Sequence, residues 1–130
     1  MRFIGRRSDP APTALIERMS WAEQLTADNA RITLFVAFNY GGRAEILDAA
    51  RSFTGQTEED FRRHLYAPEM HDPDLIIRTS GERRLSNYLL WQSAYSELVF
   101  RDELWPDFSR DAFEESLAEF EARRRRFGGR

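Results

Sequence analysis

The sequence predicts an α/β protein in which helices flank a parallel sheet. Along the 130 residues, short apolar segments alternate with segments of helical periodicity, and this alternation is typical of strands connected by helices. Residues 32–38, ITLFVAF, are almost continuously apolar, as expected of a strand covered on both faces. The chain contains no internal repeat and no low-complexity linker. We therefore expect a single folded unit.

The composition is that of a folded protein without thiol chemistry. Hydrophobic residues make up 42% of the chain and aromatic residues 13%, enough for a packed core. The absence of cysteine excludes disulfides, zinc–thiolate sites and thiol catalysis. No apolar run approaches the roughly 20 residues that span a bilayer, and the first ten residues do not resemble a signal peptide. We expect a cytoplasmic protein without a transmembrane segment, which could lie peripherally on a membrane.

The charge of the chain is acidic overall and unevenly distributed. The formal net charge is −3, and all 19 basic residues are arginine. The charged residues within 102–121 are mostly acidic, whereas residues 123–126 form a basic block. An acidic chain lacks the positive field on which nucleic-acid binding depends. We therefore expect no nucleic-acid partner.

The first 70 residues are predicted to form two strands and three helices. The expected order is a strand at 2–5, a helix at 13–27, a strand at 32–38, a helix after 42 and a helix after 57. Thr13 and Thr57 can cap their helices, because a hydroxyl accepts a hydrogen bond from an unpaired N–H group of the first turn. Helical spacing places Leu15, Met19 and Ala22 on one buried face.

Two further patterns describe the later helices of this half. The helix after residue 42 is expected to turn four apolar residues inward, namely Ile46, Leu47, Ala50 and Phe53. Gly55 ends that helix. The helix after Thr57 carries acids at 58–60, which suit the positive end of the helix dipole.

The most informative stretch begins with an apolar strand at 75–77, which places Arg78 at its end. A turn of small residues follows at 79–81, and Ser86 is expected to open a buried, aromatic-rich helix over about 87–94. A strand, a polar turn and a helix N-terminus in this order are typical of an anion site, because backbone N–H groups and the helix dipole face the ligand. Beyond it we expect a strand at 98–100.

A last helix is expected after Ser109, which can cap it. Phe113, Leu117 and Phe120 follow at helical spacing and predict its buried face. Trp105 and the proline after it separate this helix from the strand before it.

Several charged and polar residues near the turn have both a functional and a structural interpretation. Arg78 and Arg84 can each bind two phosphate oxygens through a planar guanidinium. Alternatively, Arg78 pairs with Glu82 and Arg84 is a solvated surface charge. Ser86 is an adequate helix cap with or without a ligand, and Glu97 would be an ordinary surface acid in most proteins.

The stretch RTSGERRLSNYLLWQSAYSEL at 78–98 resembles the C-terminal signature of the cis-prenyltransferases, the undecaprenyl diphosphate synthase family. Other segments match the family pattern in the same order: RFIGR at 2–6, AEQLTADNARITLFVAFNYGGRAEI at 22–46, HLYAPEMHDPDLIIRTSGE at 64–82, ELVFRDELWPDF at 97–108 and RRRRFGG at 123–129. The resemblance implies the C-terminal part of a parallel-sheet, helix-flanked fold like that of undecaprenyl diphosphate synthase.

The resemblance also implies a reaction and roles for particular residues. Family members condense isopentenyl diphosphate with an allylic prenyl diphosphate and use Mg²⁺. The family's isopentenyl-diphosphate-binding positions fall on Arg78, Arg84, Leu85 and Ser86, and its Mg²⁺-binding glutamate falls on Glu97.

The end of the chain and one early residue carry further implications of the resemblance. Arg126 and Gly128 match an Arg-x-Gly tail that contacts a diphosphate in the neighbouring subunit of a homodimer. Arg6 departs from the family pattern, which has an acidic residue after the glycine.

The family's catalytic half, with its Asp-Gly-Asn-Gly-Arg loop, finds no counterpart in this sequence. We therefore expect residues 1–130 to be the C-terminal portion of one cis-prenyltransferase domain, with no catalytic residue of its own and inactive alone. An alternative is a non-catalytic homologue or partner subunit that dimerises with a full-length enzyme. A third is a generic anion-binding α/β module.

Overall fold

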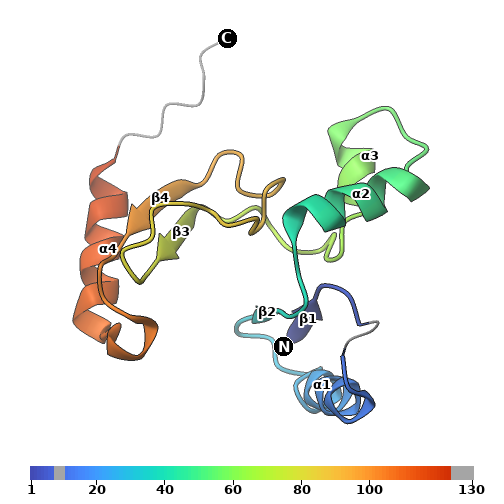
Figure 1. The fold of residues 1–130 in the computed structure, drawn as a ribbon, viewed down its shortest axis with the longest axis horizontal. Helices are drawn as coiled ribbons and strands as arrows, with labels where there is room; N and C mark the ends of the chain where they lie inside the picture. Colours follow the sequence, from blue (N-terminus) through green and yellow to red (C-terminus); the bar gives the residue numbers. More distant parts are fainter. Residues whose placement is uncertain (8–10, 124–130) are drawn as a thin grey trace. The chain divides into compact units, whose positions relative to one another are not determined.

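The computed structural model describes residues 1–7 and 11–123. The chain divides into two compact units, Met1–Met70 and His71–Arg130. Each unit contains one two-stranded parallel sheet with helices beside it (Figure 1). The parallel pairing confirms the α/β class, whereas the expectation that the chain is part of one domain stays a prediction.

The described residues of the first unit form five regular elements. They are β1 (Arg2–Ile4), α1 (Thr13–Leu25), β2 (Phe35–Ala37), α2 (Gly42–Ser52) and α3 (Glu58–Arg62). Strand β1 pairs with β2 in a register that sets Ile4 beside Ala37. Helix α1 is tied to β1 by the Phe3 N–H, which donates to a carboxylate oxygen of Glu23 (2.9 Å). The apolar core of this unit includes Ile4 and Met19, both buried.

Strand β2 is shorter and less buried than its sequence predicts. Ile32 and Leu34 precede the strand, and the Ile32 side chain is 81% exposed. The continuous apolar pattern was expected to mark a strand covered on both faces, and this expectation is wrong for the described residues. Among the residues that the structure describes, β2 pairs with β1 alone, so the hydrogen bonds of one short partner limit its length.

Two expectations about helices in this unit are also wrong. Thr13 does not cap α1, because Pro12 occupies the N-cap with an extended backbone and Thr13 is already helical. On α2, Leu47 and Ala50 are exposed, whereas Glu45 is 1% exposed. The Glu45 carboxylate accepts hydrogen bonds from the Tyr40 hydroxyl (2.6 Å) and the Tyr66 N–H (3.0 Å). A hydrogen-bonded acid can be buried, and the apolar pattern gives no sign of it.

The predicted start of α3 is confirmed. The Thr57 hydroxyl accepts a hydrogen bond from the Asp60 N–H (3.1 Å), and the Asp60 carboxylate accepts one from the Thr57 N–H (3.3 Å). This reciprocal arrangement is a capping box, which satisfies two backbone donors at once. It explains how a helix of five residues has a well-defined beginning.

The second unit contains β3 (Leu75–Arg78), β4 (Glu97–Phe100), the 3₁₀ helix η1 (Trp105–Asp107) and α4 (Arg110–Ala122). Strands β3 and β4 run parallel, with Leu75 opposite Glu97 and Arg78 opposite Phe100. Helix α4 packs on β4 (Figure 1). Val99, at the centre of the pair, is fully buried.

The predicted helix over 87–94 is wrong. Residues 86–95 form successive turns, and positive φ angles occur at Ser86 (50°), Asn87 (65°) and Leu89 (44°). A right-handed helix cannot contain such residues, so Ser86 is not a helix cap. The expected burial on all sides is wrong as well, because Tyr95 is 77% exposed.

Helix α4 begins where the sequence predicts, with a different buried face. The Ser109 hydroxyl accepts a hydrogen bond from the Ala112 N–H (3.1 Å) and caps the helix. The buried residues are Ala112 and Ser116, whereas Phe113 and Leu117 are exposed. The Ser116 hydroxyl is satisfied by donating to the Ala112 carbonyl oxygen (2.7 Å). The buried face of α4 is therefore made by small residues, and two of the larger apolar residues are exposed.

None of the helices in the described ranges combines the length and the apolar character that crossing a bilayer requires.

Candidate functional site

A cavity of about 270 Å³ lies beside the carboxyl end of β3. Its wall consists of residues from β3 and from the segment after it: Ile76, Ile77, Arg78, Thr79, Ser80, Leu85 and Tyr88. Open α/β sheets bind ligands at the carboxyl ends of their parallel strands. The cavity combines one guanidinium and several hydroxyls with an apolar wall, so it suits a small ligand with an anionic end and an apolar body.

Arg78 is the charged residue of this wall. The expected structural alternative, an ion pair between Arg78 and Glu82, is absent, because Glu82 pairs with Arg84 instead. Within residues 1–7 and 11–123, the guanidinium of Arg78 has no hydrogen-bond or ion-pair partner. Its donors are therefore available to a ligand in the cavity.

The backbone N–H groups of the turn are already used. The Ser80 N–H donates to the Glu103 carbonyl oxygen (2.8 Å), and the Gly81 N–H donates to the Arg101 carbonyl oxygen (2.9 Å). Both turn residues have positive φ angles, 72° and 67°. The expectation that these N–H groups and a helix N-terminus face an anion is therefore wrong. The cationic part of the site is carried by Arg78.

The other predicted diphosphate-binding residues are divided between the cavity and the exposed segment next to it. Leu85 lines the cavity with Arg78. Arg84 and Ser86 are exposed and do not belong to its wall, and the Arg84 guanidinium is held by Glu82.

The hydroxyl residues of the cavity were not singled out from the sequence. Thr79 and Ser80 belong to the wall together with Tyr88, and burial raises the pKa of Tyr88. Thr79 and Ser80 could have been inferred from their position directly after Arg78. Tyr88 lies in the segment 87–94, for which the sequence predicts a buried helix.

Glu97 lies at the other end of the strand pair. It is opposite Leu75, whereas Arg78 is opposite Phe100, which separates the two backbones by about 10 Å along the strands at roughly 3.3 Å per residue. The Glu97 carboxylate accepts a hydrogen bond from the Arg123 Nη1 (3.1 Å). This arrangement places Glu97 outside the wall of the Arg78 cavity.

Arg123 holds Glu97 from the end of α4. Its guanidinium also pairs with Glu119 and donates to the Leu98 carbonyl oxygen (2.8 Å). The hydrogen bonds to Glu119 and then Glu97 raise the pKa of Arg123. The carboxylate of Glu97 is thus already paired with a cation from its own unit, which it shares with Glu119.

A magnesium site needs more ligands than the described side chains provide. No group of three or more histidine, aspartate or glutamate side chains in residues 1–7 and 11–123 is arranged to hold a metal ion. Mg²⁺ in proteins usually takes one or two carboxylates and completes its shell with phosphate oxygens and water. Glu97 could supply one oxygen after leaving Arg123, so the described residues alone do not form the site. The magnesium requirement stays a prediction.

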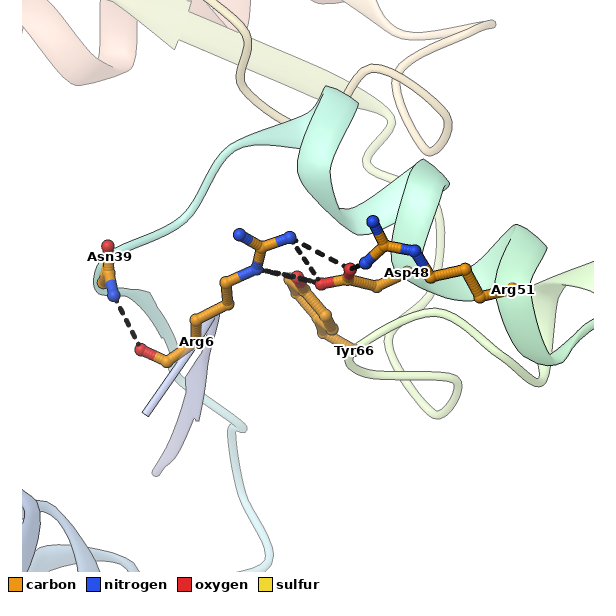
Figure 2. Close-up of polar contacts among 5 residues, drawn as sticks. All are labelled: Arg6, Asn39, Asp48, Arg51 and Tyr66. Carbon is orange, nitrogen blue, oxygen red and sulfur yellow. Dashed lines mark hydrogen bonds and ion pairs between the residues drawn. The ribbon is translucent and has the colours of Figure 1, made fainter. Parts of the chain in front are cut away.

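A second polar cluster lies at the carboxyl end of β1 in the first unit (Figure 2). Asp48 on α2 accepts hydrogen bonds from Arg6 (2.9 Å), from Arg51 (2.8 Å) and from the Tyr66 hydroxyl (2.5 Å). The Tyr66 hydrogen bond, followed by Arg6, lowers the pKa of Asp48. The Asn39 side chain donates to the Arg6 carbonyl oxygen (3.0 Å).

In this cluster Arg6, the residue that departs from the family pattern, joins β1 to α2. Its partner Asp48 is occupied by donors from the chain itself, which indicates a structural role. Arg126 and Gly128, the predicted tail contacts, lie outside the described residues.

A parallel α/β protein with an arginine at the carboxyl end of a strand is a candidate for binding a phosphorylated ligand, and comparison with known proteins identifies the family. The family model described as putative undecaprenyl diphosphate synthase matches residues 1–128. The chain belongs to this family of prenyltransferases. This confirms the resemblance seen in the sequence.

Two curated relatives and one solved structure illustrate the similarity. The isoprenyl transferase of Thermotoga maritima is 49% identical over 138 residues, covering 99% of this chain and 59% of the relative. Isoprenyl transferase 2 of Bradyrhizobium diazoefficiens is 51% identical over 140 residues, covering 99% of this chain and 55% of the relative.

The solved structure is that of lavandulyl diphosphate synthase from Lavandula x intermedia in complex with dimethylallyl diphosphate. It matches with a TM-score of 0.91 and 34% identity, covering 98% of this chain and 59% of that chain. The present chain therefore spans between half and two thirds of the length of each of these three proteins.

Proposed function

We propose that this chain supplies the isopentenyl-diphosphate side of a cis-prenyltransferase, which condenses isopentenyl diphosphate with an allylic prenyl diphosphate to form polyprenyl diphosphates such as undecaprenyl diphosphate. One observation carries the proposal: Arg78 lines a cavity at the carboxyl end of β3 and has no ion-pair partner in the described ranges. Family membership supports the reaction class. The relative in complex with dimethylallyl diphosphate is itself a protein that binds a prenyl diphosphate.

The cavity suits the two ends of isopentenyl diphosphate. Arg78 can bind two oxygens of the diphosphate at once, since a guanidinium presents parallel N–H donors. The hydroxyls of Thr79 and Ser80 can add neutral hydrogen bonds, and Leu85 and Ile77 offer apolar contact to the five-carbon group. A volume of about 270 Å³ is near the lower end of the range for ligand pockets, about 300 Å³, which favours one small substrate.

Arg84 and Ser86 are expected to contact the same diphosphate, after Arg84 has left its present partner. Arg84 is held by Glu82 in this structure, and a diphosphate carries more negative charge than one carboxylate. We therefore expect Arg84 to exchange Glu82 for the ligand, with Ser86 beside it. Mg²⁺, when bound, would neutralise charge on the diphosphates, with Glu97 supplying one oxygen.

Binding and turnover are expected to differ in the isolated chain. We expect the 130-residue chain to bind isopentenyl diphosphate weakly and to form no polyprenyl product by itself, because the residues expected to act on the allylic diphosphate have no counterpart in its sequence. In a homodimer or a dimer with a full-length homologue, Arg126 and Gly128 would contact diphosphate in the neighbouring subunit.

A second candidate function is that of a non-catalytic subunit in such a dimer. The surface of the second unit favours it, since large apolar side chains are exposed around η1 and α4: Leu104, Trp105, Phe113 and Leu117. An exposed patch of this kind is typical of a protein interface. Co-purification with a full-length homologue, with Leu117→Glu as the variant expected to abolish it, distinguishes this candidate from a chain that acts alone.

Calorimetric titration of the full chain with isopentenyl diphosphate tests the main proposal. The Arg78→Ala variant should bind at least about tenfold more weakly, because a charge-assisted hydrogen bond contributes roughly 1.5–3 kcal/mol. Arg83→Ala is the matched control, since Arg83 is exposed and lies outside the cavity wall. Equal affinity of the two variants would contradict the site, and polyprenyl product from the isolated chain would contradict the division between binding and turnover.

A further inference from the structure

Arg101, directly after β4, is held by two carboxylates. Its Nε and Nη2 donate to the two oxygens of the Glu103 carboxylate (3.2 and 2.7 Å), and Nη2 also donates to Glu115 on α4 (2.8 Å). The Arg101 side chain is 18% exposed. The hydrogen bonds to Glu103 and then Glu115 raise its pKa. The guanidinium therefore fastens the segment 101–103 to α4.

The backbone of this segment carries the loop of the candidate site. The carbonyl oxygens of Arg101 and Glu103 accept the N–H groups of Gly81 (2.9 Å) and Ser80 (2.8 Å), and the Arg101 N–H donates to the Arg78 carbonyl oxygen (2.8 Å). Three backbone hydrogen bonds thus connect residues 78–81 to residues 101–103. The loop that presents Arg78 to the cavity rests on these acceptors.

The side chain of Arg101 links the two ends of the acceptor segment, because it bonds to Glu103. Residues 101–103 belong to no helix or strand, and the paired residues of β3 and β4 end at Arg78 and Phe100, just before them. Two hydrogen bonds join the side chain of Arg101 to that of Glu103, two residues later, and so form a ring across the segment. Because hydrogen bonds weaken steeply as their angle departs from linear, releasing this ring would weaken the bonds to Ser80 and Gly81.

We propose that Arg101 is a positioning residue for the diphosphate site, which fixes residues 101–103 and thereby holds the 78–81 loop so that Arg78 faces the cavity. Arg101 does not itself line the cavity. The identity of the ligand rests on the proposed function above, whereas the support of the loop does not depend on it.

Amide hydrogen exchange on the full chain tests this support without a ligand. In Arg101→Gln, the Ser80 and Gly81 N–H groups should exchange about tenfold faster, because local opening sets their protection. The Glu97 N–H, which donates to the Asp74 carbonyl oxygen (3.0 Å) at the far end of the strand pair, should be unaffected. Arg101→Lys should not restore protection, since one ammonium cannot reproduce the paired bonds to a carboxylate.

Titration with inorganic pyrophosphate measures the consequence for binding. Arg101→Gln should bind about five- to tenfold more weakly, as expected when a charged group is less well oriented. Arg110→Gln is the matched control, because Arg110 pairs with Glu114 on α4 (2.7 Å) and has no contact with the loop. It should leave both exchange and binding unchanged.

The exchange experiment decides the role of Arg101, and binding by the unchanged chain decides the proposed function. Unchanged exchange at Ser80 and Gly81 in Arg101→Gln would overturn the inference, and so would equally accelerated exchange at Glu97, which would mean that Arg101 supports the whole unit. If this variant does not fold, Glu115→Gln removes one of the two carboxylates and is judged by the same amides. Failure of the unchanged chain to bind pyrophosphate would overturn the proposed function, while the exchange result would still decide the inference.

Discussion

Arg78 and Glu97 lie at opposite ends of one pair of parallel strands. Arg78 closes β3 opposite Phe100, and Glu97 opens β4 opposite Leu75. In the sequence they belong to one continuous signature, yet only Arg78 lines the cavity. Glu97 is instead paired with Arg123. Their separation predicts that the two residues affect diphosphate binding in different ways.

Glu97→Gln should leave metal-free binding of isopentenyl diphosphate within about twofold of the unchanged chain, because its effect on a site about 10 Å away is screened by solvent. If Glu97 supplies an oxygen to Mg²⁺, the variant should lose any increase in affinity that Mg²⁺ produces. Titrations in EDTA and in MgCl₂ measure both quantities. A loss of metal-free affinity as large as that of Arg78→Ala would show that the two residues share one site.

Asp48→Asn should destabilise the first unit at neutral pH and much less in acid. The folded-state pKa of Asp48 is lowered by Tyr66 and Arg6, so its carboxylate stabilises the folded state above the unfolded pKa of about 3.9. This contribution is lost as the pH falls through the lowered pKa. The urea midpoints of the two proteins should therefore differ at pH 7 and converge as the pH falls through this lowered pKa.

Asp28→Asn is the control for this pH dependence. Asp28 is exposed and makes no ion pair in the part of the chain that the structure describes, so the variant should unfold with the same midpoint as the unchanged chain. The urea midpoints of Asp48→Asn and the unchanged chain could instead differ by the same amount at every pH. That result would show that the carboxylate charge of Asp48 does not stabilise the folded state.

Thr57→Ala should cost about 1 kcal/mol of unfolding free energy, because its hydroxyl accepts the Asp60 N–H in the capping box. Thr13→Ala should be close to neutral, since Pro12 and not Thr13 occupies the N-cap of α1. Urea unfolding of the two variants provides a direct comparison of one threonine that caps a helix and one that does not. Equal losses would contradict the assigned start of α1.

Ile4→Ala should cost about 2–5 kcal/mol, because it removes a buried side chain from the core of the first unit. Ile32→Ser should change the unfolding free energy by less than about 0.5 kcal/mol, as substitutions of exposed residues usually do. Chemical denaturation measures both. A large loss in Ile32→Ser would mean that residues 32–34 are buried, as their apolar sequence suggests.

Local signals in the sequence predict the elements with clear beginnings. The strand that ends at Arg78 is bounded by small residues, and the helices that begin after Thr57 and Ser109 have hydroxyl caps. Each of these signals acts within three or four residues. The structure confirms all three.

The same reasoning fails for the backbone after Ser86 and for the buried acid on α2. The segment after Ser86 has an apolar composition that favours a buried helix, but left-handed residues at 86, 87 and 89 exclude one. The buried position of Glu45 depends on Tyr40 and on the Tyr66 N–H, 21 residues away along the chain.

The sequence by itself determines the family, the α/β class and the position of Arg78 at the end of a strand, because all three follow from the order of residues along the chain. Only the tertiary structure decides which groups remain available to a ligand. Ser80 and Gly81 are bonded to the segment 101–103, Glu82 holds Arg84, and Arg78 has no such partner in the described ranges. The physical reason is that a donor's availability depends on the acceptors that folding brings near it, and these come from parts of the chain that no local pattern connects.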